Sequence, residues 1–305
     1  MEKLELHIHA NTDCNLQCKH CYNNSGNYKN ERMERKELYR YLTLFTDNYN
    51  CDIHLEGGEL FLYPDVFEVL EQLNSSVLKH ITITTNGTIL NKNYKVLHIL
   101  RKIGCLRISI EGHLQSIHEK IRNSSLETVL KNAKFYQKQG VNVSIRMTLN
   151  KYNENMIFKE GIPSLLKSGF KKIQVYEFQE VGRGKHNDFK VTRNYQDIFQ
   201  EFSAIKEVCQ IKMMLAQRHL QTVLISNLEQ EGIFVKINEQ EKGLSILANG
   251  DVTVCPWDSK KIIANFKQMT DKDIINFMNT HNFIHECEFC SKVVLEKTND
   301  ESKYL

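Results

Sequence analysis

Three cysteines near the start of the chain have the residue type and spacing of cluster ligands. Cys14, Cys18 and Cys21 form a C-x3-C-x2-C run directly after an apolar segment. Three thiolates on one loop can bind three irons of a cubane [4Fe–4S] cluster, whereas an electron-transfer cluster of this kind normally takes four protein ligands. The fourth iron would stay open to the amine and carboxylate of an amino acid. The alternative is a zinc site, which takes four ligands and which the nearby His20 would complete.

A second cysteine group lies toward the other end of the chain. Cys255 follows the sequence Gly-Asp-Val-Thr-Val, and Cys287 and Cys290 form a C-x2-C pair about thirty residues later. This spacing is typical of ligands for an iron–sulfur cluster or for a structural zinc ion. We therefore predict a second metal centre in the C-terminal part of the chain.

Two glycines and an acidic residue follow another apolar segment. Gly57 and Gly58 carry no Cβ atom, so they let a backbone and a ligand approach each other closely. Glu59, the next residue, has a carboxylate that can face an ammonium group. A pair of glycines alone would indicate only a turn, so this segment gains its meaning from its neighbours.

The elements that must position these residues are six apolar runs with strand character, which alternate with segments of helical periodicity. The strand-like runs span residues 4–9, 52–55, 80–84, 106–110, 141–147 and 172–176. The helix-like segments span residues 34–45, 66–73, 92–101, 126–139 and 154–168. Strands that alternate with helices predict a parallel sheet with right-handed crossovers, either open or curled into a barrel.

The position of the polar residues favours the barrel. Residues suited to ligand binding lie at or just past the C-terminal ends of the predicted strands, namely Cys14, Gly57, Asn86, Ser109 and Arg146. That end of the strands is the active face of a barrel. Because there are six repeats rather than eight, we predict an α/β fold built on a partial (β/α)6 TIM-type barrel, whose open side would admit a bulky substrate.

The pattern changes after residue 190. A helix is predicted at 195–208, and a hairpin is predicted at 244–254 around the turn at Asn249 and Gly250. We therefore divide the chain into a barrel at 1–190, a helical bridging segment at 191–235 and a small hairpin-plus-helix module at 236–305.

The strand-end segments, taken in order, resemble those of radical S-adenosylmethionine (SAM) enzymes, in the branch that carries C-terminal SPASM or Twitch domains. Besides the cysteine run, the segments that carry the resemblance are Leu-Glu-Gly-Gly-Glu at 55–59, Thr-Thr-Asn-Gly-Thr at 84–88, Ile-Ser-Ile-Glu-Gly at 108–112 followed by 118–122, Arg-Met-Thr at 146–148 and Val-Gly-Arg-Gly at 181–184. One departure is Leu60, which replaces the proline usual after the acidic residue.

The resemblance implies a set of cofactor contacts. Ser109 and Arg146 would contact the carboxylate of SAM, and Glu59 would hold its amine beside Gly57 and Gly58. The adenine would be flanked by His20 and by the backbone near Val181 and Gly182, with Asn86 in the same cofactor site.

The resemblance also implies the chemistry. An electron from the cluster would cleave SAM reductively, and the resulting 5′-deoxyadenosyl radical would abstract a hydrogen atom from the substrate. Such a site must exclude solvent and hold the target C–H bond within contact distance. No side chain needs to act as a general acid in that first step.

The second cysteine group resembles a Twitch domain, which holds an auxiliary [4Fe–4S] cluster. In that pattern another cysteine usually precedes the hairpin, near Gly243, but residues 237–243 contain none. Cys209 is the only upstream candidate, and its distance from the hairpin makes it a poor one. Either a group other than cysteine supplies the fourth ligand, or the auxiliary cluster has an open iron.

The leading hypothesis is modification of a ribosomally made peptide by crosslinking, thioether formation, epimerisation or oxidation. We expect a precursor peptide as substrate and a flavodoxin or ferredoxin as electron donor. Since the first strand begins close to Met1, leader recognition would fall to a separate protein or to the barrel surface. The alternatives are a small-molecule radical SAM dehydrogenase or cyclase of aminosugar or cofactor biosynthesis and, more remotely, a zinc-bound interaction module.

Charge and composition exclude some partners. The 305 residues include 40 basic and 37 acidic side chains, a formal charge of +3 that demands neither a nucleic acid nor an anionic membrane as partner. The first residues show no signal peptide, and no segment approaches the length of a membrane span. We therefore expect a cytoplasmic protein whose cysteines serve metal chemistry rather than disulfides.

Overall fold

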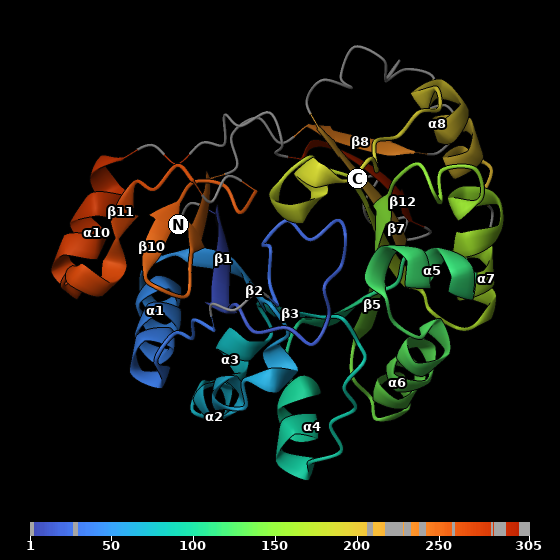
Figure 1. Cartoon of the computed structure of the whole chain (residues 1–305). Coiled ribbons are helices and arrows are strands. Elements are labelled where there is room, and N and C mark those ends of the chain that lie inside the picture. Colours follow the sequence, from blue (N-terminus) through green and yellow to red (C-terminus); the bar gives the residue numbers. More distant parts are fainter. Residues whose placement is uncertain are drawn as a thin grey trace.

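One sheet runs through the described part of the chain. The computed structural model describes residues 3–26, 30–205, 210–216, 228, 233–237, 242–257, 260–281, 283 and 291–298. Twelve strands lie side by side in the order β11-β10-β9-β1-β2-β3-β4-β5-β6-β7-β12-β8. The sheet curves, and the helices between its strands lie outside the curve (Figure 1).

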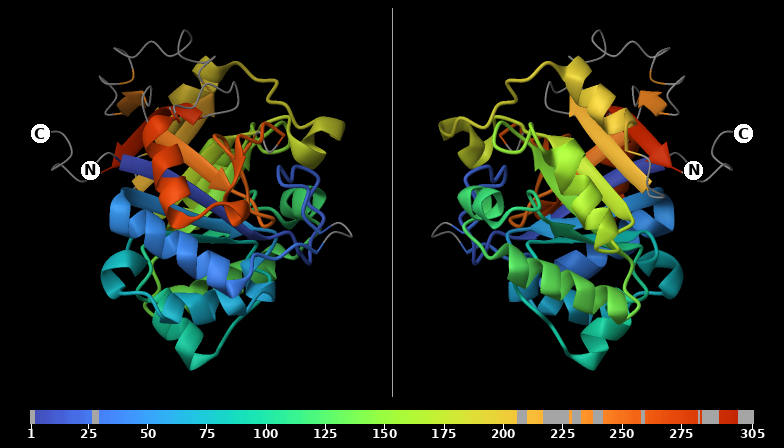
Figure 2. Two further views of the ribbon diagram at one scale, coloured as in Figure 1. Left: turned by 90° about the vertical axis from the view of Figure 1, so that its left-hand side faces the viewer. Right: turned by 90° about the vertical axis from the view of Figure 1, so that its right-hand side faces the viewer.

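The centre of the sheet is a run of parallel strands in chain order. They are β1 (Lys3–Asn11), β2 (Asn50–Gly57), β3 (Ile81–Thr85), β4 (Cys105–Ser109), β5 (Val143–Leu149), β6 (Lys172–Glu177) and β7 (Gln210–Ala216). Because the strands are parallel, their C-terminal ends meet at one end of the sheet, where the loop after β1 also lies (Figure 2). The six predicted strands and the predicted α/β partial barrel are confirmed.

Helices cover the outer face of these strands. They are α1 (Arg35–Asn48), α2 (Asp65–Glu71), α3 (Ser75–Leu78), α4 (Tyr94–Leu100), α5 (Gln115–Arg122), α6 (Leu126–Lys138) and α7 (Ile162–Lys167), which a π-helical turn at Ile157–Gly161 precedes. At α6 a polar side chain fixes the start of the helix, because the Ser125 hydroxyl accepts a hydrogen bond from the Thr128 amide. No helix among the described residues has both the length and the apolar character to cross a bilayer.

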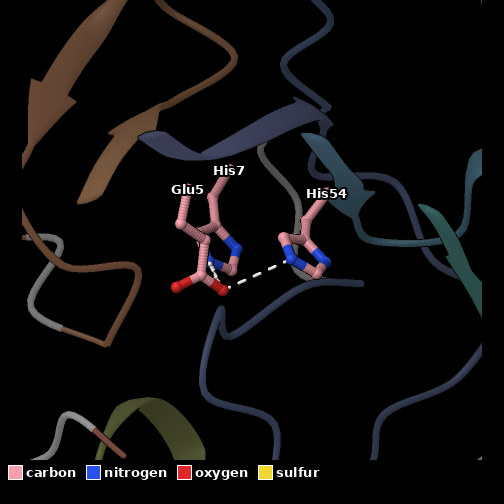
Figure 3. A group of neighbouring side chains, drawn as sticks. All are labelled: Glu5, His7 and His54. Carbon is pink, nitrogen blue, oxygen red and sulfur yellow. Dashed lines mark ion pairs between the residues drawn. The ribbon is translucent and has the colours of Figure 1, made fainter. Parts of the chain in front are cut away.

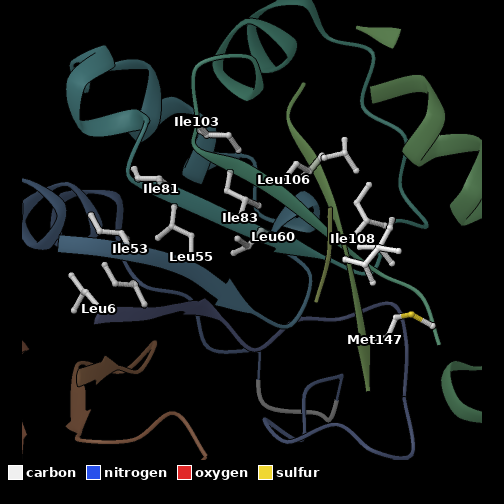
Figure 4. Packing of buried hydrophobic residues seen from close by; sticks show 14 of the residues in the cluster. Leu6, Ile53, Leu55, Leu60, Ile81, Ile83, Ile103, Leu106, Ile108 and Met147 are labelled. Carbon is white, nitrogen blue, oxygen red and sulfur yellow. The ribbon is translucent and has the colours of Figure 1, made fainter. Parts of the chain in front are cut away.

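Side chains along each strand alternate between the hydrophobic core on one face of the sheet and the barrel interior on the other. In β1, Leu4, Leu6 and Ile8 are at most 3% exposed and belong to the main hydrophobic core. Figure 4 shows Leu6 in that core with side chains of the neighbouring strands, such as Ile53 and Ile83. Since successive side chains of a strand point to opposite faces, the intervening polar residues of β1 line the interior of the barrel.

Strand β7 differs from the sequence-based expectation. Residues 210–216 fall in the segment 191–235 that we predicted to be a helical bridge, and they instead extend the parallel sheet beside β6, after the helix α8 (Tyr195–Ser203). Ile211, Met213 and Leu215 alternate and are buried. The run is short and contains lysine, glutamine, methionine and alanine, which have little preference for strands, so its pattern gave a weak signal.

The C-terminal elements attach to both edges of the barrel sheet. The predicted hairpin is present as β9 (Lys242–Ile246) and β10 (Asp251–Thr253), and β9 pairs in parallel with β1. The short β11 (Ala264–Asn265) and the helix α10 (Asp271–Thr280) follow. At the other edge, β12 (Ser291–Thr298) lies between β7 and β8 (Phe234–Ile237). Because one sheet crosses all three proposed segments, the boundaries 1–190, 191–235 and 236–305 stay a prediction.

Phe266 docks the C-terminal module on helix α1. Its side chain is fully buried, and its ring centroid lies 6.3 Å from that of Tyr41, 6.1 Å from that of Phe45 and 5.9 Å from that of Phe277. We expect Phe266→Ala to lower the free energy of unfolding by about 3–5 kcal/mol, because it empties a buried aromatic site. Urea unfolding followed by circular dichroism measures the change.

The matched control is Tyr94→Ala on helix α4, where the aromatic side chain is 73% exposed. This change should alter the free energy of unfolding by less than about 0.5 kcal/mol. Equal urea midpoints for the two variants would show that Phe266 contributes nothing to docking the module.

Candidate active site

The three predicted cluster ligands lie together in one pocket. Cys14, Cys18 and Cys21 come from the loop after β1 and line a pocket at the C-terminal ends of the strands. Other predicted cofactor residues line the same pocket, namely His20, Gly57, Gly58, Asn86, Ser109 and Arg146. The barrel therefore brings together side chains that the sequence separates by more than a hundred residues.

The surroundings of the thiols fit a [4Fe–4S] cluster. The Leu16 amide lies 3.4 Å from the Cys14 Sγ, the Asn86 Nδ2 lies 3.9 Å from the same sulfur, and an Arg122 Nη1 lies 3.8 Å from the Cys18 Sγ. Burial raises the pKa of both thiols, that of Cys18 to about 11. Bound iron would displace these thiol protons, and N–H donors of this kind stabilise cluster sulfurs.

The glycines Gly57, Gly58 and Gly182 hold the cysteine loop. A Cβ atom on Gly58 would lie 1.9 Å from the Asp13 carbonyl oxygen, and one on Gly57 would lie 2.5 Å from the Asn11 carbonyl oxygen. At the other end of the loop, a Cβ atom on Gly182 would lie 2.2 Å from the Tyr22 carbonyl oxygen. The close approach that we predicted for Gly57 and Gly58 therefore involves the backbone of the cluster loop itself.

Glu59 stabilises the site through hydrogen bonds from a position outside the pocket lining. Its carboxylate is fully buried and accepts hydrogen bonds from the Thr85 hydroxyl at 2.7 Å, the Asn86 amide at 2.7 Å and the Phe61 amide at 3.1 Å. Glu59 is not among the described residues that line the pocket. The predicted contact of Glu59 with the SAM amine stays a prediction. The hydrogen bonds that the structure gives it come from Thr85 and Asn86, at the start of the loop after β3.

Glu56 is the carboxylate that lines the pocket. It accepts a hydrogen bond from the Tyr22 hydroxyl at 2.8 Å and from the Thr84 hydroxyl at 3.3 Å, and an Arg146 Nη1 lies 3.6 Å away. Burial alone would raise its pKa, but the hydrogen bond from His7 and the nearby cations hold that pKa well below its usual range. Sequence reasoning missed Glu56, although its position two residues after His54 on β2 indicated that it faces the barrel interior.

A third buried carboxylate, that of Glu111, sits between the cysteine loop and β5. It accepts a hydrogen bond from the Arg122 Nε at 2.7 Å and one from the Thr148 amide at 2.9 Å, and the His20 Nε2 lies 3.3 Å away. Burial opposes ionisation, yet Arg122 and His20 hold the pKa of Glu111 far below its ordinary value. This pairing keeps the Arg122 cation beside the Cys18 thiol. The sequence contained both residues in the strand-end segments but gave no sign of their contact.

Arg146 lies against aromatic rings in the pocket wall. Its guanidinium carbon is 4.4 Å from the centre of the Tyr176 ring and 5.7 Å from that of the Trp257 ring. Trp257 also packs edge to face on Tyr22, with ring centroids 4.6 Å apart. Sequence reasoning did not assign Trp257 to the site, and the C-terminal segment thus contributes a wall of the cofactor pocket.

The remaining predicted residues divide into three groups. Ser109 is 4% exposed and lines the pocket with His20. Val181 and Gly182 do not line the pocket, but Gln179 and Arg183 beside them do. Cys255 is buried two residues before Trp257, while Cys287, Cys290 and Cys209 lie outside the described residues.

A group of polar side chains lies in the barrel near the start of β1 and β2. Glu5, His7 and His54 point toward one another (Figure 3). The Glu5 Oε1 lies 3.3 Å from the Nε2 atom of each histidine. Such a set could hold a metal ion, but the imidazole rings are stacked with an interplanar angle of 15°. The nitrogen lone pair of an imidazole lies in the plane of its ring, so the lone pairs of two stacked, nearly parallel rings do not point at one shared metal ion.

The position of the proton on neutral His54 fits a hydrogen-bonded network rather than a metal site. An Arg107 Nη1 lies 3.3 Å from the His54 Nδ1. Because a guanidinium only donates, this nitrogen must accept, and the proton of a neutral His54 therefore sits on Nε2 and points to Glu5. His7 joins the network to the pocket, since its Nδ1 lies 3.4 Å from a Glu56 oxygen.

Comparison with known proteins agrees with this geometry. The family model of the radical SAM superfamily matches residues 10–159. The chain is 25% identical over 146 residues to the antilisterial bacteriocin subtilosin biosynthesis protein AlbA of Bacillus subtilis, covering 47% of this chain and 32% of that protein. It is 28% identical over 193 residues to a GTP 3′,8-cyclase of Staphylococcus epidermidis, covering 58% and 55%.

Solved structures share the fold at low sequence identity. Streptococcus suis SuiB bound to S-adenosylmethionine superposes with a TM-score of 0.68 at 17% identity, covering 89% of this chain and 65% of that one. The enzyme anSMEcpe with bound AdoMet and the Cp18Cys peptide gives a TM-score of 0.61 at 20% identity, covering 95% and 88%. The chain spans about a third to a little over half of the two curated relatives.

The cysteine loop, the glycine segment and the parallel partial barrel together define a radical SAM fold. This chain belongs to the radical SAM superfamily of iron–sulfur enzymes. A [4Fe–4S] cluster and SAM are the cofactors that membership implies.

Gly58 provides a test of how the loop is held. We expect Gly58→Ala to lower the iron content and the visible absorbance of the reconstituted protein severalfold, because a Cβ atom would meet the Asp13 carbonyl oxygen at 1.9 Å. The matched control is Gly161→Ala, where a Cβ atom would meet nothing closer than 3.7 Å. Full cluster content in both variants would contradict the close approach.

His7 provides a test of the charge network. Burial alone would lower its pKa, but hydrogen bonds with Glu5 and Glu56 raise it from 6.5 to about 9. A raised pKa stabilises the folded state fully below about pH 6.5, and this contribution is lost as the pH rises through about 9. It amounts to at most about 3.5 kcal/mol, at about 1.4 kcal/mol per pKa unit.

We therefore expect the free energy of unfolding of the unmodified chain to fall between pH 7 and pH 10 by more than that of His7→Gln. Denaturant unfolding at several pH values measures both slopes. His98→Gln, an exposed position on α4, should follow the unmodified chain. Parallel slopes for the unmodified chain and His7→Gln would refute the network.

Proposed function

We propose that this chain is a peptide-modifying radical SAM enzyme with its cluster on Cys14, Cys18 and Cys21. When bound, the cluster supplies the electron that cleaves SAM to a 5′-deoxyadenosyl radical, which takes a hydrogen atom from the substrate. The protein's part is to hold SAM and the substrate carbon in contact and to keep water out.

The pocket residues suggest how SAM is held. Arg146 and Ser109 bind the carboxylate of its methionine end, as the family resemblance implies. His20 is suited to an adenine contact, because it lines the pocket and its buried Nδ1 has no hydrogen-bond partner among the described residues. Its Nε2 is already engaged, 3.3 Å from a Glu111 oxygen and 3.5 Å from an Arg122 nitrogen, so the adenine would meet Nδ1.

The rings of Trp257 and Phe178 close the pocket. Both line it, and Phe178 is 4% exposed. Apolar rings in these positions displace water from the space around the reacting carbon. The C–H bond to be attacked would lie between them and the cysteine loop.

One observation carries the peptide assignment, and it concerns charge. The cations on the inner face of the barrel lie close to carboxylates: an Arg107 nitrogen is 4.0 Å and an Arg146 nitrogen 3.6 Å from Glu56, and the Lys212 Nζ is 3.2 Å from Glu296. A nucleoside triphosphate needs cations that are free to pair with its phosphates. With Arg146 taken by the SAM carboxylate and with Arg107 and Lys212 beside carboxylates, these three cations are poorly placed to bind phosphates. The interior is then better suited to an uncharged, hydrogen-bonding substrate such as a peptide.

The similar proteins support this choice in part. AlbA serves bacteriocin biosynthesis, SuiB has been solved bound to its precursor peptide SuiA, and anSMEcpe has been solved with a bound peptide. The second candidate function is a small-molecule cyclase, which the longer match to GTP 3′,8-cyclase favours.

Further partners follow from the chemistry. We place an auxiliary [4Fe–4S] cluster on Cys255, Cys287 and Cys290, where it would exchange electrons with the substrate across the wall that Trp257 forms. The first cluster needs a one-electron donor, and a flavodoxin or ferredoxin fits that need. A separate protein that binds the leader of the precursor peptide is a further expected partner.

Anaerobic reconstitution tests the proposed function. We expect about four irons per bound cluster, hence about eight per chain, and 5′-deoxyadenosine formation from SAM under dithionite. Replacing Cys14, Cys18 and Cys21 by alanine should abolish 5′-deoxyadenosine, because no cluster binds. The matched control is Cys51→Ala, a buried cysteine whose Sγ contacts the Phe45 carbonyl oxygen in the core, and it should retain the reaction.

The substrate class is tested with the same protein. Incubation with the product of a neighbouring short open reading frame, followed by mass spectrometry, should show a mass change in the peptide. A cyclised product from GTP would favour the second candidate instead. A colourless protein with zinc and no 5′-deoxyadenosine would refute both.

A further inference from the structure

His9 is a buried histidine that the cofactor site does not use. It lies on β1, two residues after His7 on the same inner face of the sheet, and is 2% exposed. Its ring meets the Tyr22 ring edge-on with centroids 5.8 Å apart. Tyr22 in turn contacts Glu56 and Trp257 in the pocket wall. His9 therefore lies next to the inner wall of the pocket.

Both ring nitrogens of His9 lack a hydrogen-bond partner among the described residues. The other buried or nearly buried histidines of the site differ, because His7, His20, His54 and His118 each have at least one nitrogen in a polar contact. An unpaired buried donor and acceptor cost free energy, so a fold keeps such a group only with another use for it.

Other unpaired polar atoms lie on the same inner face. The Ser245 hydroxyl is fully buried without a partner, and Ser245 pairs in register with His7 across β1 and β9. The Arg107 Nε is likewise buried without a partner, although its Nη1 contacts His54. Unpaired donors and acceptors thus come from β1, β4 and β9, which indicates a site that a polar ligand completes.

The charge state of His9 limits the chemistry of that ligand. Burial lowers the pKa of His9 to about 4, with Glu56 and His7 as the nearest charged influences. The ring is therefore neutral, with one N–H donor and one acceptor nitrogen. A phosphate or carboxylate would find no positive charge on this ring. The Glu56 carboxylate would repel such an anion and lies 4.0 Å from the Arg107 guanidinium, whose charge it offsets. A peptide backbone offers the complementary pair, a carbonyl acceptor on one peptide group and an N–H donor on another.

We propose that His9 is a substrate-contacting residue that donates one hydrogen bond to a backbone carbonyl oxygen of the substrate and accepts one from the N–H of another of its peptide groups. This inference rests on the proposed function, since it takes the substrate to be a peptide. It places a stretch of substrate backbone beside His9 on the inner face of the sheet, with Ser245 and Arg107 as further polar contacts.

The test compares melting temperatures of the full chain with its cluster. His9→Phe and the smaller His9→Leu remove the unpaired nitrogens and keep an apolar side chain, so at least one of them should melt no lower than the unmodified chain. The matched control is His118→Phe, because His118 is also fully buried but its nitrogens contact the Glu111 amide and the Ser124 hydroxyl. His118→Phe should melt lower.

The ligand class is tested with N-acetylglycinamide, a small molecule with two peptide groups. At high concentration it should raise the melting temperature of the unmodified chain, and this shift should disappear in both His9 variants. GTP and N-acetylglucosamine, at matched concentrations, should produce no shift that depends on His9.

Three results would overturn the inference. The first is a fall in melting temperature in both His9 variants that is as large as the fall in His118→Phe. The second is a melting-temperature shift with N-acetylglycinamide that is absent from the unmodified chain or persists in the His9 variants. The third is a melting-temperature shift with GTP or N-acetylglucosamine that depends on His9. Failure of the proposed function is distinguishable, since it would appear as absent 5′-deoxyadenosine in the unmodified chain while the melting comparison still reports on His9.

Discussion

A carboxyl group inside a protein is stable only when hydrogen-bond donors or cations satisfy it, and the architecture of this site follows from that requirement. Glu56, Glu59 and Glu111 are each at most 5% exposed. Each carboxyl group contacts residues from other parts of the chain. Glu59, just after β2, accepts a hydrogen bond from the Asn86 amide, and Glu111 contacts Thr148 of β5 and His20 of the cysteine loop. Glu56 of β2 accepts a hydrogen bond from the Tyr22 hydroxyl, next to the last cysteine of that loop. Removal of any one would leave its partners as unpaired buried polar groups, so the three acids position the pocket as a set.

Close backbone packing supplies the second constraint. The cysteine loop crosses the glycines at 57 and 58 on one side and Gly182 on the other, with no room for a Cβ atom at any of them. The Glu59 amide donates to the Asp13 carbonyl oxygen at 2.7 Å, and the Arg183 amide donates to the Cys21 carbonyl oxygen at 2.9 Å. The loop that offers the thiols is thus fixed at one end by the segment at the end of β2 and at the other by the turn at Gly182–His186, which follows β6.

The C-terminal segment is part of the same site rather than an addition to it. Strand β9 pairs with β1, the strand that leads into the cysteine loop, and Trp257 reaches the pocket beside Arg146 and Tyr22. A change in the C-terminal module would therefore be felt in the pocket wall. Through this pairing, the segment that carries Cys255 is linked to the strand that leads into the cysteine loop.

Local patterns in the sequence determined the cluster loop, the six βα repeats and the hairpin, because spacing, periodicity and turn residues are properties of neighbouring residues. They also predicted Ser109 and Arg146 at strand ends. Ser109 is the last residue of β4, whereas Arg146 lies within β5, and both line the pocket with the cysteines. The short β7 was missed because its residues have weak strand preference. Several features were decided only by the tertiary structure. They are the closeness of Glu56 to Tyr22 and Arg146, the contact between Arg122 and Cys18, the hydrogen bonds of Glu59 to the Asn86 loop, and the His9 ring without a hydrogen-bond partner among the described residues. Each depends on which side chains from distant strands face one another across the curved sheet, and that is fixed by curvature and register, which no local pattern encodes.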